Sequence, residues 1–371
     1  MATISPQRTV SVARKEVLHV LRDPTALFFA LFIPVLELLL LGYAIDTNVR
    51  YVRTVVLDAA RTQESRALLR GFVNSEDFTV VGEVVSDAAL SRAIVAGRAR
   101  VGIKVPEDYS RRLQAGQTAQ VLVLVDGSES SVAATAVNVS NAIALRESLV
   151  RVLGGQALPV ESRPRVLFNP DTRSANFFIP GLMVVLCQML AVLLTASAIV
   201  REKENGTLEQ LFMTPVRAGE LVLGKLAPYV ALTFLQVGTI ALLMRTLFAV
   251  PIHGSFGTLL ALFLPFVLAM LGLGLLISTR AATRDAAQQM AMGTVIPSIF
   301  LSGYVFPLDS MPPFFRAVAL VIPTTWMIDA SRGVILRGAG WPELHRHAAV
   351  LWGMAVVLLT LSAIKFRKQV A

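Results

Sequence analysis

The sequence predicts a membrane protein, a bundle of six transmembrane α-helices with an external α/β domain inserted after the first helix. Hydrophobic residues make up 54% of the 371-residue chain and charged residues only 16%, whereas soluble domains carry about 25% charged residues. Six apolar runs approach or exceed the roughly 20 residues that a helix needs to cross a bilayer. Between the first two runs, residues 46–175 are polar and alternate strand-like with helix-like segments.

The first predicted span covers residues 24–45, which are apolar except for Glu37. The apolar stretch is long and no A-x-A cleavage pattern follows it, so we expect a retained helix rather than a cleaved signal peptide. Residues 1–23 form the segment before this span. They are basic and are expected to be cytoplasmic, because Lys and Arg concentrate on that side of a membrane.

The polar insert, residues 46–175, is predicted to be a small α/β domain on the external side. Strands are expected at 53–57, 78–85, 101–105 and 120–125. Helices are expected at 61–72, 86–96 (with Ser86 as its cap), 107–115 and 131–153. Such alternation is typical of an α/β fold. The insert contains no Cys and no His, so no metal or nucleophile site built on these residues is expected there.

Residues 176–371 are predicted to form the remaining transmembrane domain. Its five spans are expected at about 177–200, 226–249, 257–279, 286–306 and 347–365. A further run at 317–328 is too short to cross and lies among prolines, which favours a re-entrant or interfacial segment. With six spans, both termini and the basic segment 201–225 lie on the same, cytoplasmic side.

Three polar side chains inside the spans are candidates for a substrate pathway: Glu37, Gln188 and Gln236. A charged side chain at the centre of a bilayer costs about 2.5–3.5 kcal/mol, so Glu37 should face protein or water rather than lipid. The alternative for all three is interhelical hydrogen bonding that holds the bundle together.

One motif suggests nucleotide binding but lacks its essential parts. The run from Gly219 to Lys225 matches GxxxxGK, yet Leu226 stands where a phosphate-binding loop needs Ser or Thr, and a membrane span follows. We therefore expect this chain not to hydrolyse ATP. The single cysteine, Cys187, excludes an intrachain disulfide or a CxxC metal pair.

A short amphipathic helix is predicted directly after the second span. Thr207 and Gln210 form a capping-box pattern, and Leu208, Leu211 and Phe212 share one face. Pro215 ends the helix. Two interpretations remain open at this point: the helix rests on lipid headgroups, or it docks into a partner protein.

This stretch resembles the permease subunits of the type-2 ABC exporters, the ABC-2 family. That family carries R-E-x-E-x-G-T-x-E-x-L, then T-P, and then G-K before the next span. The matching residues here are Arg201, Glu202, Glu204, Gly206, Thr207, Glu209, Leu211, Thr214, Pro215, Gly224 and Lys225. Asn169-Pro170 before the second span and the run 178–181 at its start also agree with the family, and the layout agrees over the whole chain.

The resemblance implies a permease of an ATP-driven exporter, in the bacterial inner membrane and surrounded by lipid. It implies that the segment from Arg201 to Pro215, Leu208 and Phe212 included, contacts a separate ABC ATPase. ATP and Mg would bind that ATPase, and this chain would hold no cofactor. A second permease chain, identical or different, would complete the pathway.

The large insert resembles that of permeases that work with a periplasmic adaptor protein and an outer-membrane channel, so the resemblance implies these two as further candidate partners. Nucleic acid is not an expected partner, although the net charge is +9, because a membrane protein collects basic residues on its cytoplasmic side.

The alternative function is a membrane-anchored receptor or assembly scaffold that acts through its external domain. Copurification of an ATPase distinguishes the two, and the substrate is not indicated.

Overall fold

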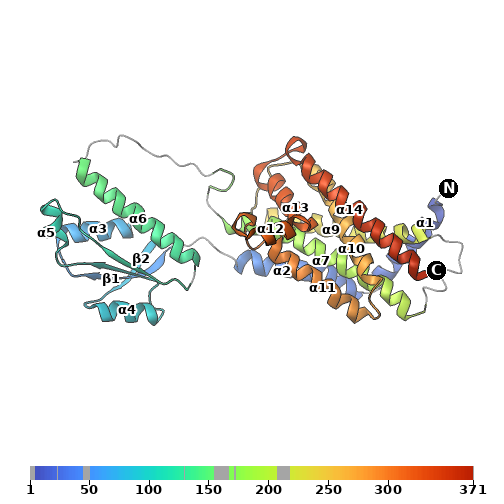
Figure 1. Ribbon diagram of the computed structural model, residues 1–371, viewed down its shortest axis with the longest axis horizontal. Helices are drawn as coiled ribbons and strands as arrows, with labels where there is room; N and C mark the ends of the chain where they lie inside the picture. The colour runs from blue at the N-terminus through green and yellow to red at the C-terminus, as the bar shows by residue number, and fades with distance from the viewer. Residues whose placement is uncertain are drawn as a thin grey trace. The chain divides into compact units, whose positions relative to one another are not determined.

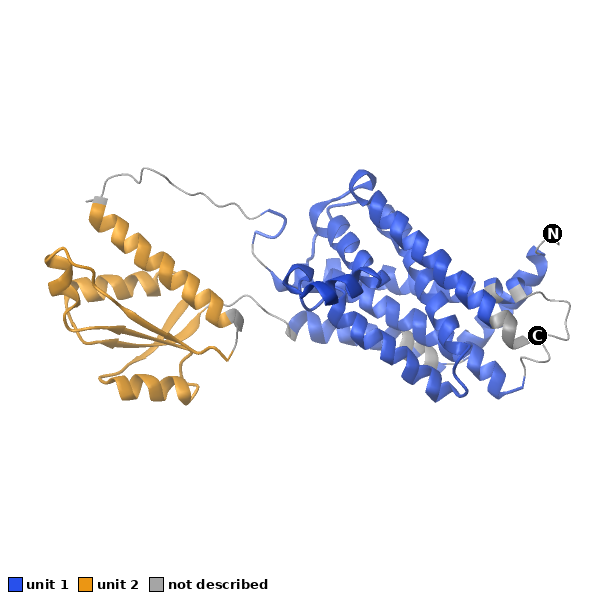
Figure 2. Cartoon of the chain, viewed as in Figure 1, with its two compact units in different colours: residues 1–45, 167–371 blue, residues 46–166 orange. Residues whose placement is uncertain are grey.

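The computed structural model describes residues 5–22, 24–44, 51–128, 130–153, 167–170, 173–206 and 218–370. The chain divides into two compact units, a helical unit of Met1–Ile45 with Leu167–Ala371, and an α/β unit of Asp46–Val166 (Figure 2). The predicted insert extended to 175. The boundary falls earlier because Asn169 Oδ1 accepts hydrogen bonds from the Arg173 amide (3.1 Å) and the Asn176 side chain (2.8 Å), which joins this stretch to the helical unit.

The α/β unit contains a four-stranded mixed sheet with the strand order β2-β1-β3-β4. The strands are β1 (Val52–Asp58), β2 (Phe78–Glu83), β3 (Val101–Val105) and β4 (Leu122–Val125). Strand β1 is parallel to β2 and to β3, while the edge strand β4 is antiparallel to β3. All four strands lie where β-branched apolar runs predicted them.

Helices cover both faces of this sheet, with α3 and α6 on one face and α4 on the other (Figure 1). The helices of the unit are α3 (Gln63–Val73), α4 (Asp87–Val95), α5 (Tyr109–Gln114) and α6 (Ser130–Leu153). The predicted cap of α4 is confirmed, because the Ser86 side chain accepts from the Ala89 amide. Phe72 and Ile103 are buried in the first layer and Leu90 in the second.

The helical unit contains four described helices that are long and apolar enough to cross a membrane. They are α7 (Ser174–Glu204), α9 (Ala218–Thr246), α10 (Phe256–Ser278) and α14 (Trp341–Val370). They include the predicted second, third, fourth and sixth spans. The third span ends at Thr246 rather than 249, because Ala249 takes a left-handed conformation (φ +48°). The last begins six positions before the predicted 347.

The first and fifth predicted spans correspond to α2 (Pro24–Ala44) and α11 (Arg284–Leu301). Helix α11 ends before the predicted 306, because Gly303 adopts a left-handed φ of +80°. Its composition falls short of a membrane span, and the described apolar stretch of α2, Leu31–Tyr43, is short as well. The number of six spans therefore stays a prediction.

The short apolar run before α14 forms two helices, α12 (Pro313–Leu320) and α13 (Pro323–Arg332), and the chain bends by 85° between them. Thr324 at the start of α13 contacts Gln188, and Arg332 at its end contacts Phe177 at the start of α7. Those two α7 residues are eleven positions apart, about 16 Å of helix, which is half a bilayer. This geometry favours the predicted re-entrant segment over a full crossing.

Candidate coupling and transport site

The family-like motif after the second span is only partly described. Arg201, Glu202, Glu204 and Gly206 belong to the described residues. The other motif residues lie outside them: Thr207, Leu208, Glu209, Leu211, Phe212, Thr214 and Pro215. The amphipathic helix over 207–215 therefore stays a prediction, and the structure describes what lies on either side of it.

Helix α7 ends at the motif glycine. Asn205 caps the helix, and Gly206 has a φ of +65°, in the left-handed region where a Cβ atom is unfavourable. Glu204 is the last residue of α7, and its Oε1 accepts a hydrogen bond of 2.9 Å from the amide of Arg284, the first residue of α11. A carboxylate is favourable at a helix N-terminus, so Glu204 fastens α11 to the end of α7.

Glu202 forms a buried ion pair with Lys225 near the start of α9. Only 9% of Glu202 and 4% of Lys225 are exposed, and the Lys225 ammonium donates to Glu202 Oε2. Lys15 donates to the other oxygen, Oε1, at 3.1 Å. The glutamate and the lysine of the motif thus join the helices on both sides of the undescribed segment 207–217.

An N-terminal helix, α1 (Pro6–Leu21), completes this cluster. The Tyr229 hydroxyl donates to Glu16 Oε1, and Glu220 Oε1 accepts from the Ser5 amide at 2.7 Å. A Cβ atom at Gly224 would lie 2.7 Å from Val12 Cβ, so the close approach of α1 to α9 requires glycine there. Gly224 and Lys225 both lie inside helix α9.

Sequence reasoning missed α1, which lies in the segment assigned only as a cytoplasmic extension. Two signals were present. Pro6 occupies a first-turn position, where proline is favourable. Val12 and Glu16 are four positions apart, so they share one helix face, and both are buried. The face is not uniformly apolar, so hydropathy did not predict that it is buried. Glu16 on this face is buried because it accepts a hydrogen bond from the Tyr229 hydroxyl.

In the middle of the bundle, Gln188 connects three helices. Its Nε2 donates to Ser298 Oγ of α11 at 2.7 Å, and the Thr324 hydroxyl of α13 donates to its Oε1 at 2.5 Å. All three side chains are buried. For Gln188 this favours the interhelical tie over the pathway lining.

Gln236 and Glu37 differ from Gln188. Gln236 is 2% exposed, and neither polar atom of its amide has a hydrogen-bond partner among the described residues. Glu37 is partly exposed on α2, next to the fully buried Leu38. Within the described part of the chain, no hydrogen bond joins Gln188, Gln236 and Glu37 into one site, so the pathway role of these residues stays a prediction.

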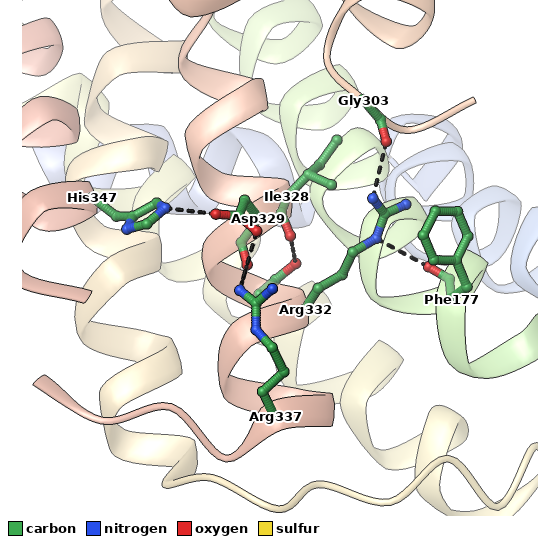
Figure 3. A network of polar contacts seen from close by, with 8 residues as sticks. Phe177, Gly303, Ile328, Asp329, Arg332, Arg337 and His347 are labelled. Atoms are coloured by element: carbon green, nitrogen blue, oxygen red, sulfur yellow. Dashed lines mark hydrogen bonds and ion pairs between the residues drawn. The ribbon is translucent and has the colours of Figure 1, made fainter. Parts of the chain in front are cut away.

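Near the start of α7, a second polar network connects helices of the bundle (Figure 3). Arg332 donates to the carbonyl oxygens of Gly303 (2.9 Å) and Phe177 (3.2 Å), and its guanidinium lies 3.8 Å from the centre of the Phe177 ring. Asp329 pairs with Arg337 (3.1 Å) and with His347 of α14 (2.8 Å). These contacts anchor α13 to α7, to the turn after α11 and to α14. The sequence feature that could have indicated this network is the pair of charged residues Asp329 and Arg332, which directly follows the apolar run 317–328.

The long apolar helices, the bent helix pair and the buried polar ties between them define a multi-pass helical membrane protein. The chain belongs to the ABC-2 family of transporter proteins, because the family model matches residues 24–364. This confirms the family resemblance and makes the chain a transmembrane transport protein.

Relatives from Escherichia coli K12 extend over the same length. The chain is 31% identical to the probable multidrug ABC transporter permease YbhS, over 99% of this chain and 98% of the relative. It is 25% identical to the probable multidrug ABC transporter permease YbhR, over 98% and 99%. It is 26% identical to the inner membrane transport permease YhhJ, over 85% of each.

Proposed function

We propose that this chain is the permease subunit of an ABC exporter in the inner membrane, and that a separate ATPase binds at segment 201–215. The observation that carries the proposal is the buried Glu202–Lys225 pair with Lys15. The pair ties the end of α7 to the start of α9, so a force on the segment between them would move both helices. The full-length similarity to proteins named multidrug permeases supports export.

In this mechanism the apolar residues Leu208, Leu211 and Phe212 anchor the segment in a groove of the ATPase, and Glu209 lies at the rim. A ligand shifts a conformational equilibrium only by its differential affinity for the two states. The segment must therefore bind the ATP-loaded and the ATP-free ATPase differently. A second permease chain forms the other half of the pathway, and an adaptor and outer-membrane channel receive the cargo.

The direct test is purification of the tagged chain from its own cells in mild detergent, followed by mass spectrometry. We expect an ABC ATPase in an amount comparable to that of the permease. Recovery of the chain with adaptor-like or receptor-like proteins and without an ATPase would favour the alternative function, a membrane-anchored scaffold.

The proposed topology predicts opposite accessibility for Ser128 and Asn205, both in exposed positions. Single cysteines at these sites, in a Cys187→Ser background, are treated with a membrane-impermeant thiol reagent. We expect labelling at 128 in intact spheroplasts and labelling at 205 only after lysis. Reaction of position 205 in intact spheroplasts would contradict cytoplasmic placement of the coupling segment.

For Glu37 we expect that Glu37→Gln keeps the protein folded but changes the pH dependence of transport, because only the acid can change its charge. Transport of a fluorescent drug panel into inside-out vesicles, at acidic and alkaline pH, measures this. Glu37→Leu tests packing separately. An unchanged pH profile for Glu37→Gln, together with loss of folded Glu37→Leu protein, would leave only a structural role.

A further inference from the structure

The α/β unit contains a groove of about 700 Å³ between its sheet and helix α6. Val121, Val123 and Val125 form one wall, on and just before the edge strand β4, and Phe72 and Leu113 contribute to the apolar lining. Sites for small molecules occupy about 300–1,000 Å³ and are mostly apolar with a few polar groups. The groove therefore has the size and lining of a small-molecule site.

The groove is open because α6 packs on the sheet only through its first half. Val132 and Ala136 are buried at 7% and 1% exposure, whereas Val152, near the end of the helix, is 82% exposed. The short edge strand β4 has no further strand beside it in the sheet order. Val123 and Val125 of β4 are accordingly only half-buried.

A buried hydroxyl of α6 lies in the lining. Ser140 is 7% exposed, and its Oγ has no hydrogen-bond partner among the described residues. A buried polar group without a partner lowers the stability of the folded protein. A ligand that hydrogen-bonds Ser140 would supply the missing partner.

The charged groups of the lining neutralise each other. Arg151 pairs with Glu147 one helical turn away, at 2.8 Å. Burial raises the pKa of the Tyr109 phenol above its ordinary value near 10, so this group is uncharged at physiological pH. The groove therefore offers no excess charge to select an ionic ligand.

We infer that this groove binds one small amphiphilic molecule that has an apolar body and an uncharged hydrogen-bonding group, such as a hydroxyl or an amide. The apolar body lies against the valine wall, and the polar group pairs with Ser140, with the exposed Asn141 beside it. This site needs neither the ATPase nor the coupling segment, so it stands independently of the proposed function.

The test uses the full chain in lipid nanodiscs and azioctanol, a photoreactive medium-chain alcohol, with labelled residues mapped by mass spectrometry. We expect saturable labelling of β4 and α6. Ala144 is exposed and lines the groove, so Ala144→Trp should fill the groove and reduce labelling by about tenfold or more. Ala142→Trp, on the same helix but outside the lining, is the matched control and should label normally.

Ser140→Ala tests the polar contact separately. Competition by decanol should weaken by about two- to tenfold, the effect of one hydrogen bond, while competition by decane should not change. The unfolding temperature of the Ser140→Ala variant should equal or exceed that of the unsubstituted protein, because the substitution removes an unpaired buried hydroxyl. Labelling confined to the transmembrane helices, or groove labelling that Ala144→Trp leaves intact, would overturn the inference.

Discussion

Replacing Lys225 by methionine should destabilise the helical unit by about 3–5 kcal/mol, because the change leaves a buried carboxylate without its main partner. Lys225 and Glu202 are both nine-tenths or more buried. Lys15 also pairs with Glu202, at 3.1 Å, but its side chain is half-exposed. It therefore offsets only part of the lost stabilisation of the Glu202 carboxylate. The single cysteine, Cys187, is fully buried, so the temperature at which it reacts with a thiol-specific dye reports unfolding directly.

Two variants separate the ion pair from general effects. Lys203→Met removes an exposed lysine at the end of the same helix α7 and should change stability by less than about 0.5 kcal/mol. The double variant Lys225→Met with Glu202→Gln removes both buried charges and should recover more than half of the loss, because the two sites are coupled. If Lys225→Met unfolds at the same temperature as Lys203→Met, the pair does not fasten α7 to α9.

Hydropathy and turn patterns predicted most elements of both units. The predicted strands at 101–105 and 53–57 match β3 and β1, because β-branched runs bounded by polar turns have few other stable conformations. The apolar runs at 177–200 and 257–279 match α7 and α10, because uncharged stretches of that length are buried as helices.

Hydropathy and turn patterns could not predict the polar contacts between helices that are distant in the sequence. Glu202 and Lys225 are 23 positions apart, and nothing in local spacing shows that the chain returns to bring them together. For the same reason Glu202 was grouped with the partner-facing residues, whereas the structure buries it inside the bundle. Helix α11 was also hard to judge from hydropathy, because its polar first turns lower the mean hydropathy of the helix. In the structure it nevertheless packs along α7: Glu204 binds the start of α11, and Arg332 binds the turn after its end.

Truncating the coupling anchors should abolish ATPase binding without affecting membrane insertion. Leu211 and Phe212 lie on the apolar face of the predicted helix, outside the described residues. Anchor residues buried in an interface cost about 2 kcal/mol or more when truncated, roughly a thirtyfold loss of affinity each. We therefore expect Leu211→Ala or Phe212→Ala to lose most of the copurifying ATPase, and the double variant to lose all of it together with ATP hydrolysis by the purified complex.

The controls distinguish docking on an ATPase from resting on lipid. Leu242→Ala truncates a leucine of α9 that is 63% exposed and should leave ATPase copurification unchanged, because it lies outside the coupling segment. Glu209→Ala should weaken binding mildly and in a salt-dependent way, as a rim charge does. A helix that only rests on headgroups predicts that Phe212→Ala retains the ATPase. If the double variant keeps both the ATPase and its hydrolysis rate, energy must enter the permease elsewhere, and the buried cluster of Lys15, Glu202 and Lys225 would then serve stability alone.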